Sequence, residues 1–204
     1  MSDEKKLEAK PTTSSVPAEN KNREFLINKN ITAENVEAII KGILEINRYD
    51  EKQEEKNSNY IRKPIKVIVD SYGGHIYCGT ALIGIIDSSE TPVHTYCYGK
   101  AMSMGFAIFA SGHKRFAHRL ATFMYHDAGS AYGGTTEQIR QDIAQLQNWV
   151  DHMEEYILSL TNLPRRKLEE VRRMKQDWFM FAEEAMSYGL VDELIESKRN
   201  KYNK

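Results

Sequence analysis

Apolar residues along the chain fall into short β-rich runs separated by longer segments with helical spacing. The runs rich in β-branched and aromatic residues predict strands at residues 24–28, 64–69, 92–98, 114–116 and 120–125. Helical spacing predicts a helix capped by Thr32 that runs through Asn47, and another over 75–89. Strands alternating with helices predict an α/β fold in which crossover helices join parallel strands.

The longest predicted helix spans residues 136–160. Its apolar positions follow steps of four and three along one narrow stripe: Ile139, Ile143, Leu146, Val150, Met153, Ile157 and Leu160. Such a stripe can pack on its own domain, but on a long helix it favours a projecting element that pairs with another subunit. A short basic helix is predicted at 163–174, and another at 181–188, which Gly189 ends.

Three polar segments mark the organisation of the chain. Residues 1–22 lack large apolar groups and predict a disordered tail. Residues 48–63 predict a charged connector too hydrophilic for the core, a polar insert within a domain spanning 23–196. Residues 197–204 predict a basic C-terminal tail.

Composition narrows the class of protein. The chain has 204 residues, of which 41% are hydrophobic, and a net charge of −1, which fits one soluble domain without an electrostatic footprint for nucleic acid or anionic membranes. Cys78 and Cys97 have no metal-ligand spacing and indicate a reducing compartment. With no signal-like or membrane-spanning run, the sequence predicts a cytoplasmic protein without a metal site.

The stretch 98–112, YGKAMSMGFAIFASG, is the centre of the predicted chemistry. It predicts a tight turn after a strand, then Ser103, then a buried helix. At a helix N-terminus, free N–H groups and the helix dipole favour the negative charge that a serine nucleophile and its oxyanion develop. The alternative is a plain N-cap serine. A hydrolase elbow reads G-x-S-x-G, and Ala101 stands in place of its first glycine.

Other candidate groups also follow predicted strands. His126 ends the run 120–125, and Gly73-Gly74 follow the run 64–69, where their N–H groups could bind an oxyanion. In parallel sheets such positions lie at a shared ligand-binding edge. Among the other histidines, His75 and His94 are the least easily dismissed as bases. The carboxylate that would orient the histidine stays open among Asp70, Asp127 and Asp177.

Four motifs, in order, resemble the Clp protease proteolytic subunit (ClpP) family over residues 24–196. DSYGG at 70–74 resembles its [ND]SPGG, and YGKAMSMG at 98–105 resembles its G-x-A-x-SMG. RFAHRLATFMYH at 115–126 resembles the segment that ends in the family's catalytic histidine. QDWFMFAEEAMSYGLVDEL at 176–194 resembles its C-terminal signature.

The resemblance implies a ClpP/crotonase-like fold and a serine endopeptidase with Ser103 as nucleophile, His126 as base and acid, and Asp177 as the orienting carboxylate. It implies oxyanion donors at the N–H groups of Gly74 and Met104. Residues 136–160 would form the family's projecting handle, through which two heptameric rings stack into a barrel. Unfolded polypeptides would be delivered by a partner AAA+ ATPase, and the chain would need no cofactor of its own, since it has no GxxxxGK[ST] loop.

The chain departs from the family pattern at several places, among them a connector at 48–63 that is longer than expected. Tyr72 replaces the proline of SPGG, in the segment where the family binds substrate backbone, so Tyr72 and Gly73 are expected to bind substrate. Asp127-Ala128 stand where the family usually has Gln-Pro, and Asp127 is likewise expected to bind substrate. Residues 1–22 do not resemble the family's N-terminal segment, which forms the axial pore and helps to dock the ATPase.

Three other function classes compete with a peptidase. A catalytically idle or regulatory ring subunit would typically have lost a triad residue, whereas all three candidates are present. A signal-peptide peptidase with a Ser–Lys dyad would usually carry a membrane anchor. A crotonase-type acyl-CoA enzyme would share the architecture and the paired backbone donors, but would have no use for the serine, histidine and aspartate together.

Overall fold

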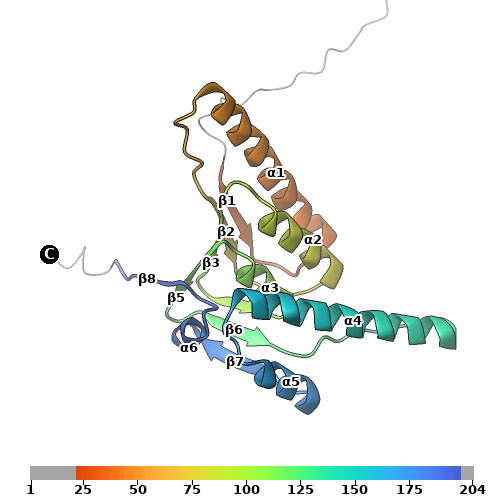
Figure 1. The fold of residues 1–204 in the computed structure, drawn as a ribbon. Coiled ribbons are helices and arrows are strands. Elements are labelled where there is room, and N and C mark those ends of the chain that lie inside the picture. Colours follow the sequence, from red (N-terminus) through yellow and green to blue (C-terminus); the bar gives the residue numbers. More distant parts are fainter. Residues whose placement is uncertain (1–21, 199–204) are drawn as a thin grey trace, which may run out of the picture.

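A computed structural model describes residues 22–198, and its largest element is a five-stranded parallel sheet (Figure 1). The sheet has the order β1-β2-β3-β5-β8, with the bounds β1 (Glu24–Ile27), β2 (Ile65–Val69), β3 (Val93–Cys97), β5 (Lys114–His118) and β8 (Glu193–Ile195). In β2 and β3, buried residues alternate with half-buried ones, as in strands with one face toward a core. The α/β architecture with parallel strands predicted from the sequence is confirmed.

A second, three-stranded sheet has the order β4-β6-β7, with β4 (Lys100–Met102), β6 (Thr122–Tyr125) and β7 (Trp178–Phe181). The β4–β6 pair is parallel and the β6–β7 pair is antiparallel. The sequence patterns predicted neither β4 nor β7. Residues 120–125 were predicted to be strand throughout, but β6 begins only at Thr122, and Leu120 is exposed.

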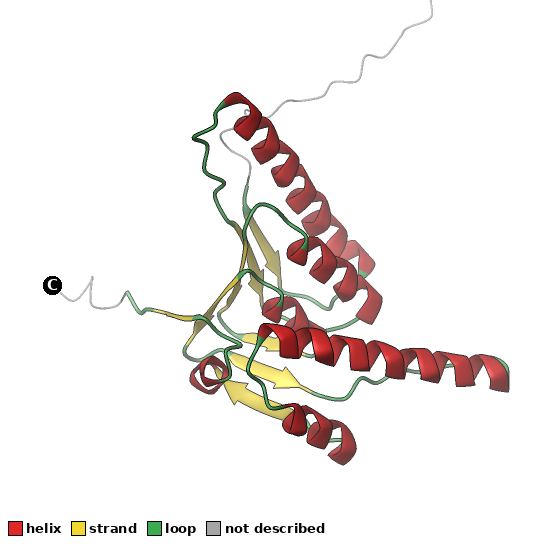
Figure 2. Cartoon of the chain, in the orientation of Figure 1, coloured by secondary structure: helices red, strands yellow, loops and turns green. Residues whose placement is uncertain are grey.

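Six helices accompany the sheets within the described residues: α1 (Ala33–Lys56), α2 (Ile76–Asp87), α3 (Met104–Ala110), α4 (Thr136–Leu160), α5 (Arg165–Met174) and α6 (Ala182–Ser187). Figure 2 shows α1 and α2 along one side of the larger sheet. All seven residues of α3 are buried in the main core. The helix predicted at 181–188 begins one residue later, because Phe181 still belongs to β7.

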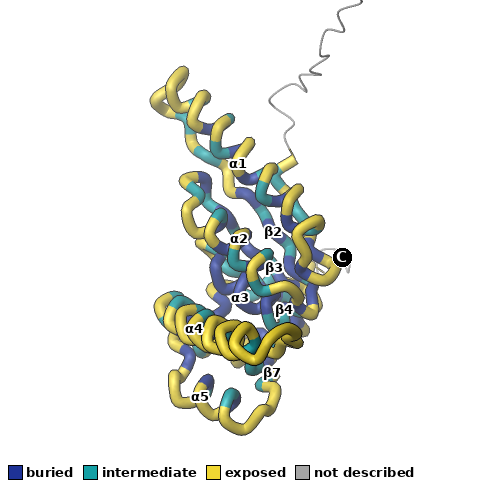
Figure 3. Tube along the Cα trace, turned by 90° about the vertical axis from the view of Figure 1, so that its right-hand side faces the viewer, coloured by how far each residue is buried: buried dark blue, intermediate teal, exposed yellow. Residues whose placement is uncertain are grey.

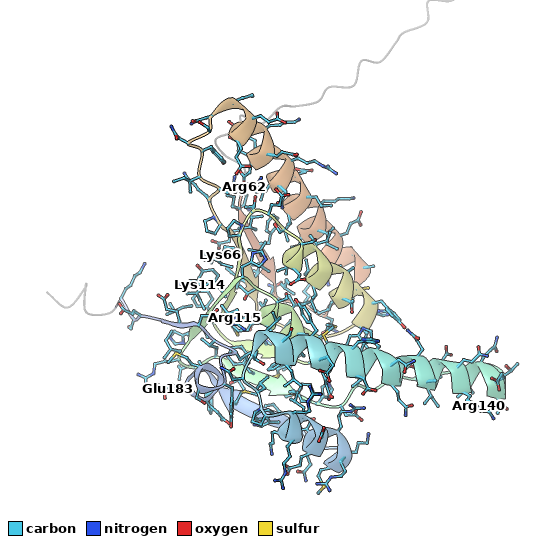
Figure 4. The ribbon with its side chains drawn as sticks, in the orientation of Figure 1. Arg62, Lys66, Lys114, Arg115, Arg140 and Glu183 are labelled. Atoms are coloured by element: carbon cyan, nitrogen blue, oxygen red, sulfur yellow. The ribbon has the colours of Figure 1, made fainter. Side chains whose placement is uncertain are left out.

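Helix α4 projects from the body of the molecule (Figure 1). A capping box at Thr135 and Gln138 fixes its start, so its bounds agree with the predicted 136–160. Its buried residues are Val150, Glu154 and Ile157, all in the C-terminal half. The N-terminal half, which carries Arg140 in Figure 4, extends away from the sheets, and Figure 3 shows that its surface is largely exposed.

The charged segment 48–63 was predicted to be a connector outside the core, and this is wrong for its first part. Helix α1 continues to Lys56, and Asp50 is completely buried. The Asp50 carboxylate accepts hydrogen bonds from Arg23, from Tyr60 Oη at 2.7 Å and from Thr91 Oγ1 at 2.7 Å. These partners lie far along the chain and are invisible to a local hydropathy pattern. They satisfy the charge that makes the segment look hydrophilic.

Removal of the Asp50 charge is expected to destabilise the fold without touching the chemistry. Burial opposes ionisation of Asp50, but its hydrogen bonds with Arg23, Tyr60 and Thr91 lower its pKa. Because Arg23 is partly exposed, Asp50→Asn should cost about 3 kcal/mol, the low end for a broken buried pair. Thermal melts at pH 7 should shift by about 6–12 °C.

The pH dependence gives an independent check on the same substitution. A carboxylate whose pKa is lowered on folding contributes stability above its unfolded pKa, and loses this contribution as the pH falls through its folded pKa. The difference in the free energy of unfolding between wild type and Asp50→Asn should therefore become smaller below about pH 4. An equal difference in unfolding free energy at pH 7 and pH 3 would mean that lost packing, rather than lost charge, causes the destabilisation.

The predicted tails fall almost entirely outside the described residues. Residues 1–21 and 199–204 are not described, so the predicted disordered tail at 1–22 and most of the basic tail at 197–204 remain predictions.

Candidate active site

Ser103 lies at a sharp turn between strand β4 and helix α3. Its φ of 53° is in the left-handed region, which few residues other than glycine adopt. Its amide donates to the Met124 carbonyl at 2.9 Å, which fixes the turn against β6. The Ser103 side chain makes no capping hydrogen bond to α3. The hydroxyl is therefore presented outward from a strained strand–helix turn, the arrangement of a nucleophile elbow.

His126 contacts this hydroxyl directly. Its Nε2 atom lies 2.8 Å from Ser103 Oγ, within hydrogen-bonding distance. The residue follows β6, and the parallel pairing of β4 with β6 sets Met102 beside Met124, so the ends of the two strands bring Ser103 and His126 together. Among the described residues, no hydrogen bond joins Ser103 to any of the other five histidines: His75, His94, His113, His118 and His152.

Asp177 is the carboxylate nearest the far side of the His126 ring. The antiparallel register pairs Tyr125 with Trp178, so the next pair outward sets His126 opposite Asp177. Asp177 Oδ1 lies 3.8 Å from His126 Nδ1, longer than a hydrogen bond, and its side chain is half exposed. Catalytic hydrogen bonds are often this long without substrate and shorten in the complex.

The other two candidate carboxylates have partners elsewhere. Asp70 Oδ1 accepts from the backbone amide and the Nζ of Lys100, each at 3.2 Å. Asp127 forms an ion pair with Lys175. Of the three acids that the sequence left open, Asp177 is the one that lies within 4 Å of a His126 ring nitrogen.

The Gly73-Gly74 segment passes close to Ser103. Gly73 has φ +108°, and a Cβ built on it would lie 2.7 Å from Ser103 Cβ and 3.1 Å from the Met104 amide nitrogen. A parallel bridge between Ile31 and Gly74 uses the Gly73 carbonyl and the His75 amide, which leaves the Gly74 amide facing the other way. Within the described part of the chain, neither the Gly74 nor the Met104 amide has an acceptor. Two free donors thus lie beside the hydroxyl.

Replacement of Gly73 by alanine is expected to separate these groups. The methyl would clash with Ser103 Cβ and with the Met102 carbonyl, at 2.9 Å, in a backbone conformation that alanine disfavours. A shift of about 1 Å at such a site costs about 100-fold in kcat. Peptide hydrolysis by Gly73→Ala and Gly84→Ala measures this. Nothing lies within 4 Å of the Gly84 Cβ position, in helix α2, so that change should leave kcat unaltered.

An apolar cavity of about 210 Å³ opens next to Ser103 and His126. Its walls come from α2, α3, β6, the loop after His126 and the inner face of α4, and include Ile76, Phe106, Tyr125, Trp149, Met153 and Ile157. Sequence reasoning had placed Met153 and Ile157 in the helical stripe without connecting them to the site, and had not singled out Trp149. Only the packing of α4 beside β6 shows this role. The cavity suits an apolar side chain.

Tyr72, in the 70–74 turn, does not line the cavity beside Ser103. It is largely exposed, and Lys100 Nζ lies 4.6 Å above its ring. Lys100 was not among the predicted site residues, because its place beside Tyr72 depends on the pairing of β4 with the 70–74 turn through the Ser71–Ala101 bridge. The segment predicted to bind substrate thus carries an accessible aromatic ring, with a cation from β4 beside it.

Residues 22–198 contain neither a metal site nor a membrane-spanning helix. No group of three or more histidine, cysteine, aspartate or glutamate residues there is arranged to hold a metal ion. No helix in this part of the chain combines the length and the apolar character needed to cross a bilayer.

Comparisons with known proteins match both the sequence and the fold. A family model described as "Clp protease" matches residues 12–198. The "ATP-dependent Clp protease proteolytic subunit 2" of Chlamydia abortus is 32% identical over 145 residues, which cover 70% of each chain. The "ATP-dependent Clp protease proteolytic subunit" of Deinococcus radiodurans is 32% identical over 137 residues, 66% of each chain.

A solved structure of a ClpP1 mutant from Listeria monocytogenes superimposes with a TM-score of 0.71 at 21% sequence identity, covering 87% of this chain and 93% of that one. A match of this extent shows a shared fold. The ClpP/crotonase-like fold expected from the sequence motifs is confirmed.

Proposed function

This chain belongs to the Clp protease family, and from that premise we propose that it is a serine endopeptidase that hydrolyses unfolded polypeptides with a Ser103–His126–Asp177 triad. The observation that carries the proposal is the 2.8 Å contact between Ser103 Oγ and His126 Nε2 at an elbow whose serine does not cap its helix. A serine with only a capping role would direct its hydroxyl to α3.

The proposed reaction uses each group in a distinct role. Ser103 Oγ attacks the peptide carbonyl while His126 Nε2 accepts its proton, and the same histidine then donates that proton to the leaving amine. The Gly74 and Met104 amides stabilise the oxyanion. Asp177 holds the imidazole with Nδ1 protonated. A water activated by His126 then releases the acyl group from Ser103 and restores the enzyme without a cofactor.

The surroundings of the triad support a proposal for substrate binding. The apolar cavity beside Ser103 would accept an apolar side chain next to the scissile bond. Tyr72, Gly73 and Asp127 border the path of the substrate, and the exposed ring of Tyr72 would replace a proline contact typical of the family.

Assembly and partners follow from the family together with the projecting helix. Clp family membership supports a ring oligomer supplied by a Clp-type ATPase. We infer that the N-terminal half of α4, where Ile143 is substantially exposed, joins two stacked heptameric rings, so that hydrolysis takes place inside a closed cytoplasmic barrel. ATP would act on the partner AAA+ unfoldase alone.

Labelling with a fluorophosphonate probe, followed by peptide mapping, tests the function. The adduct should lie on Ser103 and should disappear in His126→Ala. An unlabelled wild-type protein that light scattering shows to be fully assembled would contradict the proposal and favour the alternative, an idle or regulatory ring subunit. Labelling that persists in His126→Ala would contradict the role given to the histidine.

A further inference from the structure

The residues on both sides of His126 are tied to the segment that leads into Asp177. Tyr125, just before the histidine, donates its phenol hydrogen to Glu154 of α4. The other oxygen of Glu154 accepts from Arg172 Nη1 of α5 at 3.0 Å. Asp127, just after the histidine, pairs with Lys175, which follows α5. Within the described chain, two side-chain connections therefore join the residues on either side of His126 to the segment that precedes Asp177.

The Tyr125–Glu154–Arg172 link is the stronger of the two because it is buried. Tyr125 is 8% exposed and Glu154 is 7% exposed. Burial, reinforced by the hydrogen bond to Glu154, raises the pKa of Tyr125 well above its usual value, so the phenol stays a donor. Arg172 also binds Asp151 at 2.8 Å. By contrast, Lys175 is largely exposed, and such surface pairs contribute little.

Backbone pairing does not hold the catalytic pair itself. The β6–β7 ladder ends at Tyr125 and Trp178, so His126 and Asp177 lie one residue beyond the last paired positions. Their separation of 3.8 Å depends on how the two chain segments continue past the ladder. Glu154 fixes both: it anchors the residue before His126, and through Arg172 it anchors the end of α5, five residues before Asp177.

The Tyr125 ring adds a third connection, to the nucleophile. It packs edge-to-face against Phe106 of α3 with ring centroids 6.0 Å apart. Helix α3 begins directly after Ser103. One buried side chain, at the end of the strand that precedes the histidine, is therefore in contact with the helix that follows the serine and, through Glu154, with the helix that precedes the aspartate.

We propose that Glu154 is a positioning residue, the hub of a buried Tyr125–Glu154–Arg172 network that holds His126 in register with Asp177. The proposal rests on the proposed peptidase function, since it gives the network the task of aligning that triad. The network acts on the rate of the chemical step and not on substrate affinity, because it aligns the acid–base pair and leaves the oxyanion donors and the apolar cavity in place.

The test compares Glu154→Gln with Glu155→Gln in the full-length protein. Glu155 is the matched control: it is the next residue of α4, and it also forms an ion pair with α5, through Arg165, but this pair is exposed and has no contact with Tyr125. Glu154→Gln should lower kcat by about 10–100-fold with KM changed less than about twofold. Glu155→Gln should leave both constants unchanged.

A double-mutant cycle separates positioning from general packing. Tyr125→Phe removes only the phenol bond and keeps the ring on Phe106, so it serves even if Glu154→Gln fails to fold. It should lower kcat in the wild type, and this effect should largely vanish in an Asp177→Asn background, because the alignment no longer matters there. An equal loss in both backgrounds would overturn the proposal.

Fluorophosphonate labelling of the wild-type protein distinguishes failure of the network proposal from failure of the proposed peptidase function. If it forms a Ser103 adduct with a fluorophosphonate but Glu154→Gln and Glu155→Gln behave alike, the network proposal falls and the peptidase function stands. If the assembled wild type shows no reaction that depends on Ser103, the proposed function falls, and the network proposal falls with it.

Discussion

Replacement of Ser103 by alanine is expected to abolish peptide hydrolysis while the fold survives. Loss of the nucleophile in a serine triad lowers kcat by about 10⁶-fold, which leaves only the contribution of the oxyanion donors and substrate binding. The measurement is hydrolysis of a fluorogenic peptide carrying an apolar residue before the scissile bond, chosen to fit the cavity beside Ser103.

The structure gives a reason to expect a stable Ser103→Ala protein. Serine and alanine both carry a Cβ, so the strain at φ 53° does not change. The lost hydroxyl caps nothing and bonds only His126, an interaction worth about 1 kcal/mol. The melting temperature should therefore move by no more than about 4 °C.

Ser111→Ala is the matched control for this substitution. Ser111 lies at the other end of the same helix, is buried where Ser103 is half-buried, and donates its hydroxyl to the Ile108 carbonyl at 2.8 Å. It should retain full activity. Hydrolysis by Ser103→Ala at more than about 1% of the wild-type rate would contradict a nucleophilic serine, given the size of the effect expected.

The sequence was sufficient for four of the five strands of the larger sheet, all but β8, and for most helix positions. Strands β2 and β3 are short runs rich in β-branched and aromatic residues, and α4 has both a capping box and a helical stripe. Such signals are local, so they can be read without knowledge of the fold. The same patterns also put Ser103 and His126 after strands, which made them candidates before any geometry was known.

The second sheet could not be predicted in the same way, and it is the sheet that assembles the site. Strand β4 has only three residues, too short for a periodicity to show, and the four residues of β7, WFMF, show no alternation of apolar and polar positions. Their identity as strands comes from pairing with β6. The sequence therefore attached Ser103 to the strand at 92–98, whereas the structure places it at the end of β4, beside His126.

The predicted connector at 48–63 failed for a related reason. The run of charged residues predicted a solvent-exposed segment, yet Asp50 is buried because Arg23, 27 positions earlier, supplies a counter-charge. Glu154 is a second case, a carboxylate buried inside the apolar stripe of α4 through Tyr125 and Arg172. In both, the partner that makes burial possible is distant in sequence, so a window of hydropathy assigns the residue to the surface.

Replacement of Asp177 by asparagine is expected to have the second-largest effect on hydrolysis. An orienting carboxylate fixes the histidine tautomer and stabilises the imidazolium, and its conversion to an amide lowers kcat by up to about 10⁴-fold. The 3.8 Å separation from His126 Nδ1 means that the contact must shorten when substrate binds for the full effect to appear. Because Asp177 is half exposed, little change in folding stability is expected.

The experiment measures kcat for Asp177→Asn, Asp127→Asn and Asp70→Asn side by side. Asp127 and Asp70 already bind Lys175 and Lys100, so their losses should be much smaller than that of Asp177→Asn. Glu183→Gln, an exposed change on α6, reports any effect of surface charge alone. A loss below about tenfold for Asp177→Asn, with a larger loss for either other aspartate, would transfer the orienting role to that residue. Comparable losses for all three would mean that no single carboxylate orients His126.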